Sequence, residues 1–109
     1  MLSFSNFGSS RSQRSERVED AVVLARKLEP GLMIDGPMQA DTALDPSLQE
    51  EYPFMSFDGP ANILICPNLA SANIAYKLLE KLGGAEMTGP ILEGLDKPVQ
   101  LLSRSDGVR

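Results

Sequence analysis

Residues Ala61 to Arg104 read ANILICPNLASANIAYKLLEKLGGAEMTGPILEGLDKPVQLLSR. The stretch opens with an apolar run and continues with an amphipathic segment from Asn68 to a Gly-Gly pair. It closes with a second apolar run before Ser103 and Arg104. An apolar run without alternation is typical of a parallel strand that is covered on both faces. The order therefore predicts a strand-helix-strand unit with polar groups at the strand ends, where open α/β sheets bind their ligands.

The sequence before this unit continues the same alternation. Met1–Phe4 is an apolar strand candidate, and the apolar positions of Arg14–Glu29 recur on one face of a helix that Pro30-Gly31 ends. The other predicted elements are a strand at Leu32–Ile34, short helices at Gln39–Leu44 and Ser47–Glu51, a strand at Asn62–Cys66, a helix at Asn68–Leu82, and strands at Met87–Leu92 and Val99–Leu102. This pattern predicts one α/β domain over residues 1–109, with three α/β/α layers around a mostly parallel sheet.

Composition excludes several classes of function. Ten Lys and Arg residues against fifteen Asp and Glu residues give a net charge of -5, which argues against general binding to nucleic acid. The chain has no histidine and a single cysteine, so we expect neither a zinc site of the usual ligand types nor an internal disulfide. A lone cysteine suits the reducing cytoplasm. The chain also lacks an apolar run of the roughly 18 residues that a transmembrane helix needs, so we expect no contact with a membrane.

Two polar segments follow predicted strands and are candidates for a binding site. The loop from Ser5 to Ser10 is rich in hydroxyl and backbone N–H groups, which can hold a phosphate or an oxyanion. Serine-rich connections are also common as plain turns and helix caps. Arg104 could pair with a phosphate through two N–H bonds, and Ser103 could donate to the same oxygen. The alternative for this pair is a solvated chain segment.

Two further clusters each allow two interpretations. The first consists of Asp35, Asp41 and Asp45. Three nearby carboxylates could bind Mg²⁺, although aspartates in such a segment commonly form turns and cap helices. The second consists of Tyr52, Phe54 and Phe57. These aromatic side chains could contact another molecule or pack on the chain's own core.

Three segments resemble one family. They are LSFSNFGSS at residues 2–10, DGPMQADTALDP at residues 35–46, and the long stretch that begins GPANILICPNLASAN at residue 59. In this order they are similar to the phosphate acetyltransferase/butyryltransferase family. The resemblance implies a phosphotransacetylase-like fold of the isocitrate/isopropylmalate dehydrogenase type. It covers only the later part of the family's module, so we expect this chain to be a piece of a larger protein.

The resemblance also implies a site. Ser103 and Arg104 match the family's catalytic pattern and would face a cleft for acyl-CoA and phosphate. Ser5, Asn6, Gly8 and Ser9 would form the opposite lip of this cleft. With half of the cleft missing, we expect no turnover by this chain alone.

The family module occurs in two settings. One is phosphate acetyltransferase, which moves an acetyl group between coenzyme A and phosphate. The other is the C-terminal part of bacterial NADP-dependent malic enzymes, where the module regulates and oligomerises the enzyme and responds to acetyl-CoA. Phosphotransacetylases typically carry Thr-Lys in place of Asn6-Phe7, and an acidic pair after Ser-Arg where this chain has Gly107-Val108-Arg109. The LICPN sequence at residues 64–68 is also typical of the malic-enzyme version, whereas Pro37 departs from a glutamate common to both groups.

These differences favour the malic-enzyme setting, with phosphate acetyltransferase as the alternative. The chain is then predicted to be a cytoplasmic regulatory portion that senses acetyl-CoA. It would form a homo-oligomer, at least a dimer, with the apolar helix at Asn68–Leu82 in the contact. We expect no cofactor in this chain. NADP and a divalent metal would belong to the preceding part of the parent enzyme, which converts malate to pyruvate.

Overall fold

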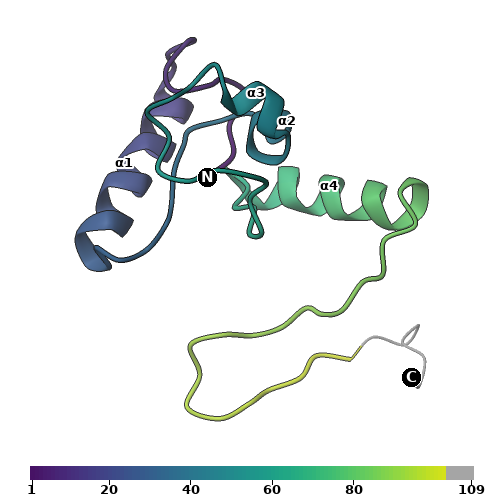
Figure 1. Ribbon diagram of the computed structural model, residues 1–109. Coiled ribbons are helices and arrows are strands. Elements are labelled where there is room, and N and C mark those ends of the chain that lie inside the picture. The colour runs from purple at the N-terminus through teal and green to yellow at the C-terminus, as the bar shows by residue number, and fades with distance from the viewer. Residues whose placement is uncertain (103–109) are drawn as a thin grey trace. The chain divides into compact units, whose positions relative to one another are not determined.

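The computed structural model describes residues 1–102. The helices in this range are α1 (Gln13–Leu28), α2 (Ala40–Leu44), α3 (Pro46–Gln49) and α4 (Leu69–Leu82), as Figure 1 shows. Each of them begins and ends within two residues of a helix that the sequence predicts. The chain divides into two compact units, Met1–Ala75 and Tyr76–Arg109. None of the helices in the described range has the length and apolar character needed to cross a membrane.

Helix α1 begins at a reciprocal cap. The Ser12 hydroxyl accepts a hydrogen bond from the Ser15 backbone N–H at 3.2 Å, and the Ser15 hydroxyl accepts one from the Ser12 backbone N–H at 2.9 Å. Such a capping box satisfies two backbone donors that would otherwise lack partners at a helix start. One face of α1 buries Val18 and Val22, which are 5% and 3% exposed. The predicted apolar stripe therefore supplies half of the small core of the first unit.

The N-terminal segment lies between two distant parts of the chain. The Leu2 backbone N–H donates to the Ile65 carbonyl at 2.8 Å, and the Ser3 N–H donates to the Met38 carbonyl at 2.8 Å. Leu2 and Met38 form a parallel bridge, and the Met38 side chain is 1% exposed. These contacts place the N-terminal segment between the segments that carry Met38 and Ile65, and its pairing with Met38 is parallel.

The expected three-layer sheet is not confirmed, because these contacts do not extend into a ladder. Leu32–Ile34 forms no strand, and Asn62–Cys66 makes one backbone hydrogen bond to the N-terminal segment without becoming a strand. In the second unit, Met87–Leu92 and Val99–Leu102 are joined only by an antiparallel bridge between Ile91 and Gln100. A parallel sheet needs helices that cover both of its faces. Here Ile63 is 70% exposed, so the central run lacks that cover among the described residues.

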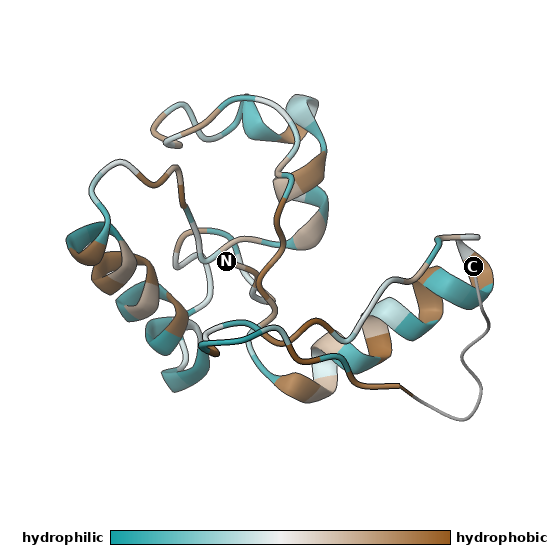
Figure 2. Cartoon of the chain, turned by 90° about the horizontal axis from the view of Figure 1, so that it is seen from below, coloured by the Kyte–Doolittle hydropathy of each residue, from teal (hydrophilic) through white to brown (hydrophobic). Residues whose placement is uncertain are grey.

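Helix α4 is apolar over most of its circumference. Figure 2 shows brown, hydrophobic ribbon on several sides of it. No residue of α4 is buried, and Leu69 and Leu82 are more than 80% exposed. The Asn68 side chain caps the helix by accepting from the Ser71 N–H at 2.9 Å, and Gly84, with φ of 66°, follows its last turn. Both ends match the local signals in the sequence, whereas the apolar surface between them is uncovered.

Candidate functional site

The polar loop after the N-terminal segment folds onto the turn before α2. The Asn6 side chain bridges the two segments: its Oδ1 accepts from the Gln39 N–H at 2.7 Å, and its Nδ2 donates to Gln39 Oε1 at 3.3 Å. The Phe7 backbone N–H donates to the Pro37 carbonyl at 2.7 Å. The amide of Asn6 is therefore engaged within the chain, where it holds the loop closed against its neighbour.

The other residues predicted for the acyl-CoA lip, Ser5, Gly8 and Ser9, differ in their exposure to solvent. Ser5 is 3% exposed, and its hydroxyl donates to the Ser10 carbonyl at 3.0 Å. Gly8 has φ of 81°, a left-handed conformation that glycine adopts without strain. Ser9 is exposed, and its backbone N–H donates to the Asn6 carbonyl at 2.8 Å. Of the two serines predicted for the lip, Ser9 alone presents its hydroxyl to solvent.

Ser103 and Arg104 lie outside the described residues, so the structure does not place them beside this loop. Their predicted roles and those of Ser5, Asn6, Gly8 and Ser9 in binding acyl-CoA or phosphate stay predictions.

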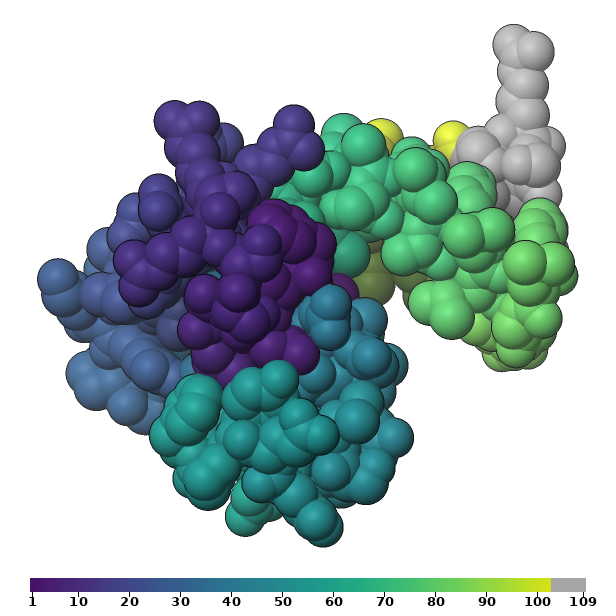
Figure 3. Space-filling model, turned by 90° about the horizontal axis from the view of Figure 1, so that it is seen from above, coloured from purple at the N-terminus to yellow at the C-terminus, as the bar shows by residue number. Residues whose placement is uncertain are grey.

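Phe7 belongs to an aromatic cluster with Tyr52 and Phe54. The ring centroids of Phe7 and Tyr52 are 5.1 Å apart, and those of Phe7 and Phe54 are 4.9 Å apart in an edge-to-face arrangement. These separations are in the favourable range for aromatic pairs. In the space-filling view, the purple N-terminal region contacts the teal segment that carries Tyr52 and Phe54 (Figure 3). Two of the three aromatic residues in the second sequence cluster thus pack on their own chain.

The three aspartates of the first cluster have separate partners within the chain. Asp35 is buried; its Oδ1 lies 3.0 Å from Arg26 Nη2, and its Oδ2 accepts from the Ser56 N–H at 2.7 Å. Asp41 Oδ1 accepts from the backbone N–H of Thr42 at the start of α2. Asp35 thus joins α1 to the loop that carries Ser56, whereas the bond of Asp41 is local. Among residues 1–102, no three acidic or cysteine side chains gather as a metal site would require.

Asp45 caps α3. Its Oδ1 accepts from both the hydroxyl and the backbone N–H of Ser47, at 2.7 and 2.9 Å. These two bonds favour the ionised carboxylate and lower the pKa of Asp45 below its usual value, with the hydroxyl bond as the larger cause.

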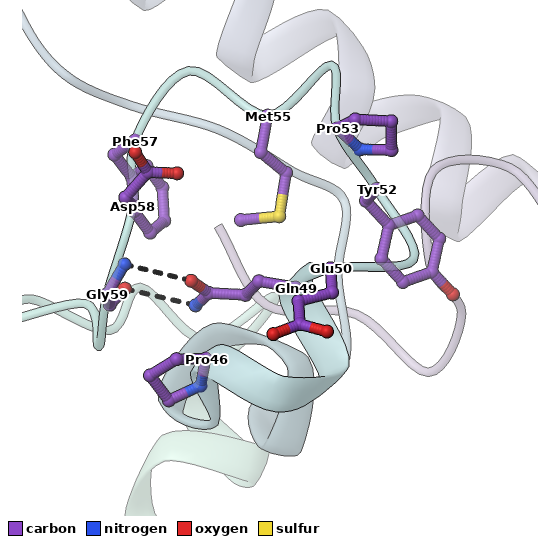
Figure 4. Close-up of a pocket in the computed structure, with 9 residues that line it drawn as sticks. All are labelled: Pro46, Gln49, Glu50, Tyr52, Pro53, Met55, Phe57, Asp58 and Gly59. Carbon is purple, nitrogen blue, oxygen red and sulfur yellow. Dashed lines mark hydrogen bonds between the residues drawn. The ribbon is translucent and has the colours of Figure 1, made fainter.

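A small cavity of about 300 Å³ lies beside α3 (Figure 4). Gln49, 8% exposed, forms its inner wall. The Gln49 amide exchanges two hydrogen bonds of 3.0 Å with the Gly59 backbone, and it also donates to the Thr42 carbonyl at 3.0 Å. The cavity is lined further by Tyr52, Met55 and other residues of the loop after α3. Gln49 therefore holds that loop closed over α2 and α3.

We expect Gln49→Ala to destabilise the protein by about 2 kcal/mol, because it leaves the backbone groups of the buried Thr42 and the half-buried Gly59 without their partner. Chemical denaturation followed by circular dichroism would measure the loss. The matched control is Glu50→Ala, since Glu50 is the exposed neighbour. Equal stability of the two variants would contradict the role assigned to Gln49.

Sequence reasoning missed a larger cavity, of about 820 Å³, in the first unit. It lies where the N-terminal segment and the run that ends at Cys66 both finish, and all of its lining residues come from Met1–Ala75. Arg14 and Arg17 of α1 line one part of it, and Asn68 and Ser71 at the start of α4 line another. The signal available in the sequence was two arginines three residues apart near a helix start, where the helix dipole disfavours cations.

Burial also affects a charged group beside this cavity. The Met1 amino group donates to the Asp35 carbonyl at 2.8 Å. Partial burial lowers the pKa of this amino group, and the nearby Asp35 carboxylate opposes the shift.

The comparisons with known proteins agree on one family. The model of the phosphate acetyl/butaryl transferase family matches residues 1–109. The NADP-dependent malic enzyme of Rhizobium meliloti is 45% identical over 105 residues, which cover 96% of this chain and 14% of the enzyme. The phosphate acetyltransferase of Bacillus subtilis is 46% identical over 105 residues, which cover 95% of this chain and 32% of the enzyme.

Solved structures agree with the sequence relatives. The EutD phosphotransacetylase from Staphylococcus aureus matches with a TM-score of 0.89 and 41% identity over 96% of this chain and 33% of its own. A phosphotransacetylase from Streptococcus pyogenes also has a TM-score of 0.89, with 40% identity. The chain thus spans about a third of the length of these acetyltransferases. It has the phosphotransacetylase-like fold and belongs to the phosphate acetyl/butaryl transferase family.

Proposed function

We propose that this chain is the regulatory and oligomerising C-terminal portion of an NADP-dependent malic enzyme, with acetyl-CoA as its effector. The observation that carries this proposal is the packing of Phe7 on Tyr52 and Phe54. By the family resemblance, a phosphotransacetylase carries a lysine in place of Phe7. In this chain that position has no charge to offer a phosphate, and its ring is used in intramolecular packing.

The neighbouring loop residues support the same proposal. The Asn6 amide is bonded to Gln39, and the Ser5 hydroxyl is bonded to Ser10. Groups that are already satisfied by the protein must give up these bonds before they can bind a substrate, which makes binding weaker. A loop with this arrangement suits a module that has kept the family's fold without its turnover.

The prediction of a three-layer fold around a mostly parallel sheet is part of this proposal as well. We infer that the N-terminal segment, with Met38 on one side and Ile65 on the other, is the centre of a mostly parallel sheet with helices on both faces. Their hydrogen bonds of 2.8 Å support this inference, as does the apolar run that Ile63 begins. The exposed apolar surface of α4 supports the proposed homo-oligomer, in which a second copy would cover it.

Two assays of the full-length protein that carries this chain test the proposed function. We expect NADP-dependent conversion of malate to pyruvate that acetyl-CoA changes several-fold, and no acetyl phosphate formation from acetyl-CoA and phosphate. Cytoplasmic location follows from the same proposal. Malate turnover that does not respond to acetyl-CoA would remove the sensing role, and absence of malate turnover would remove the whole proposal.

The second candidate is a phosphate acetyltransferase in which Ser103 and Arg104 act directly in acyl transfer between coenzyme A and phosphate. The match of this pair to the family's catalytic pattern supports it, as does the 46% identity to the B. subtilis enzyme. Acetyl phosphate formation by the full-length protein, lost in Arg104→Ala, would decide for this candidate. The matched control is Arg11→Ala, which removes an exposed arginine that belongs to neither predicted lip.

A further inference from the structure

The charged side chains that line the larger cavity of the first unit are all positive. Of the residues that line it, Arg14 and Arg17 are the ones with charged side chains, and none of the lining residues is acidic. The acidic residues of α1 itself, Glu16, Glu19 and Asp20, do not line it. This is unusual in a chain with a net charge of -5, because acidic residues outnumber basic ones over the whole sequence.

Neither arginine has a carboxylate partner in the described part of the chain. The salt bridges there join Arg26 to Asp35 and Lys81 to Glu80. Arg14 and Arg17 are three residues apart, so they project from the same face of α1. Both also lie near the N-terminal end of α1, where the helix dipole makes a positive side chain unfavourable. An anion in the cavity would offset the repulsion between the two guanidinium groups and their unfavourable interaction with the positive end of the α1 dipole.

The rest of the lining suits the body of an organic anion. Ser3, Asn68 and Ser71 line the same wall, where Asn68 Oδ1 and the Ser71 hydroxyl also bond to the backbone at the start of α4. Apolar surface comes from residues that include Leu2 and Phe4. A volume of about 820 Å³ is in the range of cavities that enclose small organic ligands.

We propose that this cavity binds a phosphate-bearing organic anion, with the guanidinium groups of Arg14 and Arg17 as direct ligands of the phosphate oxygens. Arginine is suited to this role because its planar fork donates two hydrogen bonds to one phosphate. The site is separate from the predicted acyl-CoA lip, because Ser5, Asn6, Gly8 and Ser9 do not line the cavity. It contributes a second binding position on the same module, whichever of the two parent enzymes carries it.

Isothermal titration calorimetry of the full-length protein with inorganic pyrophosphate tests the charge of the site. We expect binding that weakens as the salt concentration rises, and an affinity loss of about tenfold for each arginine removed in Arg14→Gln and Arg17→Gln. The control is Arg11→Gln, since Arg11 is also exposed and precedes α1 but does not line the cavity. Circular dichroism of each variant establishes that the fold is retained.

A second titration identifies the organic ligand. If the double variant Arg14→Gln/Arg17→Gln loses both pyrophosphate and acetyl-CoA binding, the cavity is part of the acetyl-CoA site, which would overturn its assignment as a second binding position. If it loses pyrophosphate but keeps acetyl-CoA, the cavity is a separate phosphate site. No pyrophosphate binding by the unmodified protein, or equal binding by the double variant and Arg11→Gln, would overturn the proposal. None of these outcomes depends on malate turnover, so the proposed function is tested separately.

Discussion

Gly36→Ala is expected to destabilise the protein by roughly 2–5 kcal/mol, through backbone strain and a steric overlap at the centre of the first unit. Gly36 has φ of 131°, in a region that L-residues rarely adopt. A Cβ atom at this position would overlap the Met1 backbone oxygen. The same oxygen accepts the hydrogen bond of 3.2 Å from the Met38 N–H, so movement away from the overlap would disturb the parallel pairing.

Two control substitutions separate backbone strain from steric overlap as causes of the destabilisation by Gly36→Ala. Gly94 also has a positive φ, of 81°, but no atom lies within 4 Å of its added Cβ, so Gly94→Ala measures backbone strain alone. At Gly31 the added Cβ would meet Glu29 Oε1 at 3.5 Å, which is ordinary contact, so Gly31→Ala should change stability by less than about 1 kcal/mol. Denaturant unfolding measures all three variants. A loss for Gly36→Ala no greater than that for Gly94→Ala would show that the overlap with Met1 has no effect.

Met38→Ala has the second of the two largest expected effects, a loss of about 2–5 kcal/mol of unfolding free energy. The Met38 side chain is 1% exposed and is one of the two largest fully buried side chains in the described range. Its removal takes apolar contacts from the centre of the first unit, and the backbone pairing of Leu2 with Met38 limits how far the surroundings can close the cavity. The expected cost is therefore that of lost burial together with an unfilled space.

Met33→Ala is the matched control, because it deletes the same side chain at a position that is 77% exposed. We expect it to change stability by less than about 0.5 kcal/mol. Thermal unfolding followed by circular dichroism compares the two variants. Similar losses for both would mean that Met38 does not belong to a packed core in solution.

The helices could be predicted because their signals are local. The end of α4, for example, was marked by Gly83-Gly84, and Gly84 takes the left-handed conformation of a helix stop. The start of α1 depends on Ser12 and Ser15, whose mutual hydrogen bonds join residues three apart. Such contacts depend on neighbours in the chain, so a sequence pattern of a few residues suffices to predict them.

The candidate site was predicted less well, because its geometry depends on contacts between distant residues. A serine-rich loop suggested an open anion site, but Asn6 is bonded to Gln39, 33 residues away. Phe7 packs on aromatic residues more than forty positions later, which no local pattern indicates. The arginines of the larger cavity were overlooked for the same reason, since nothing near them in the sequence showed which distant residues share their cavity.

The sequence alone determined the helices and the family. It also determined the two classes of parent enzyme between which the proposals choose. Tertiary structure decided which groups face a cavity. In the predicted lip, the Asn6 amide is bonded to Gln39 and Phe7 lies in an aromatic cluster. Packing of distant segments also brought Arg14 and Arg17 to the same cavity as Asn68. The difference is physical. A helix is stabilised by bonds between residues four apart, whereas a cavity exists only after segments far apart in the chain have packed together.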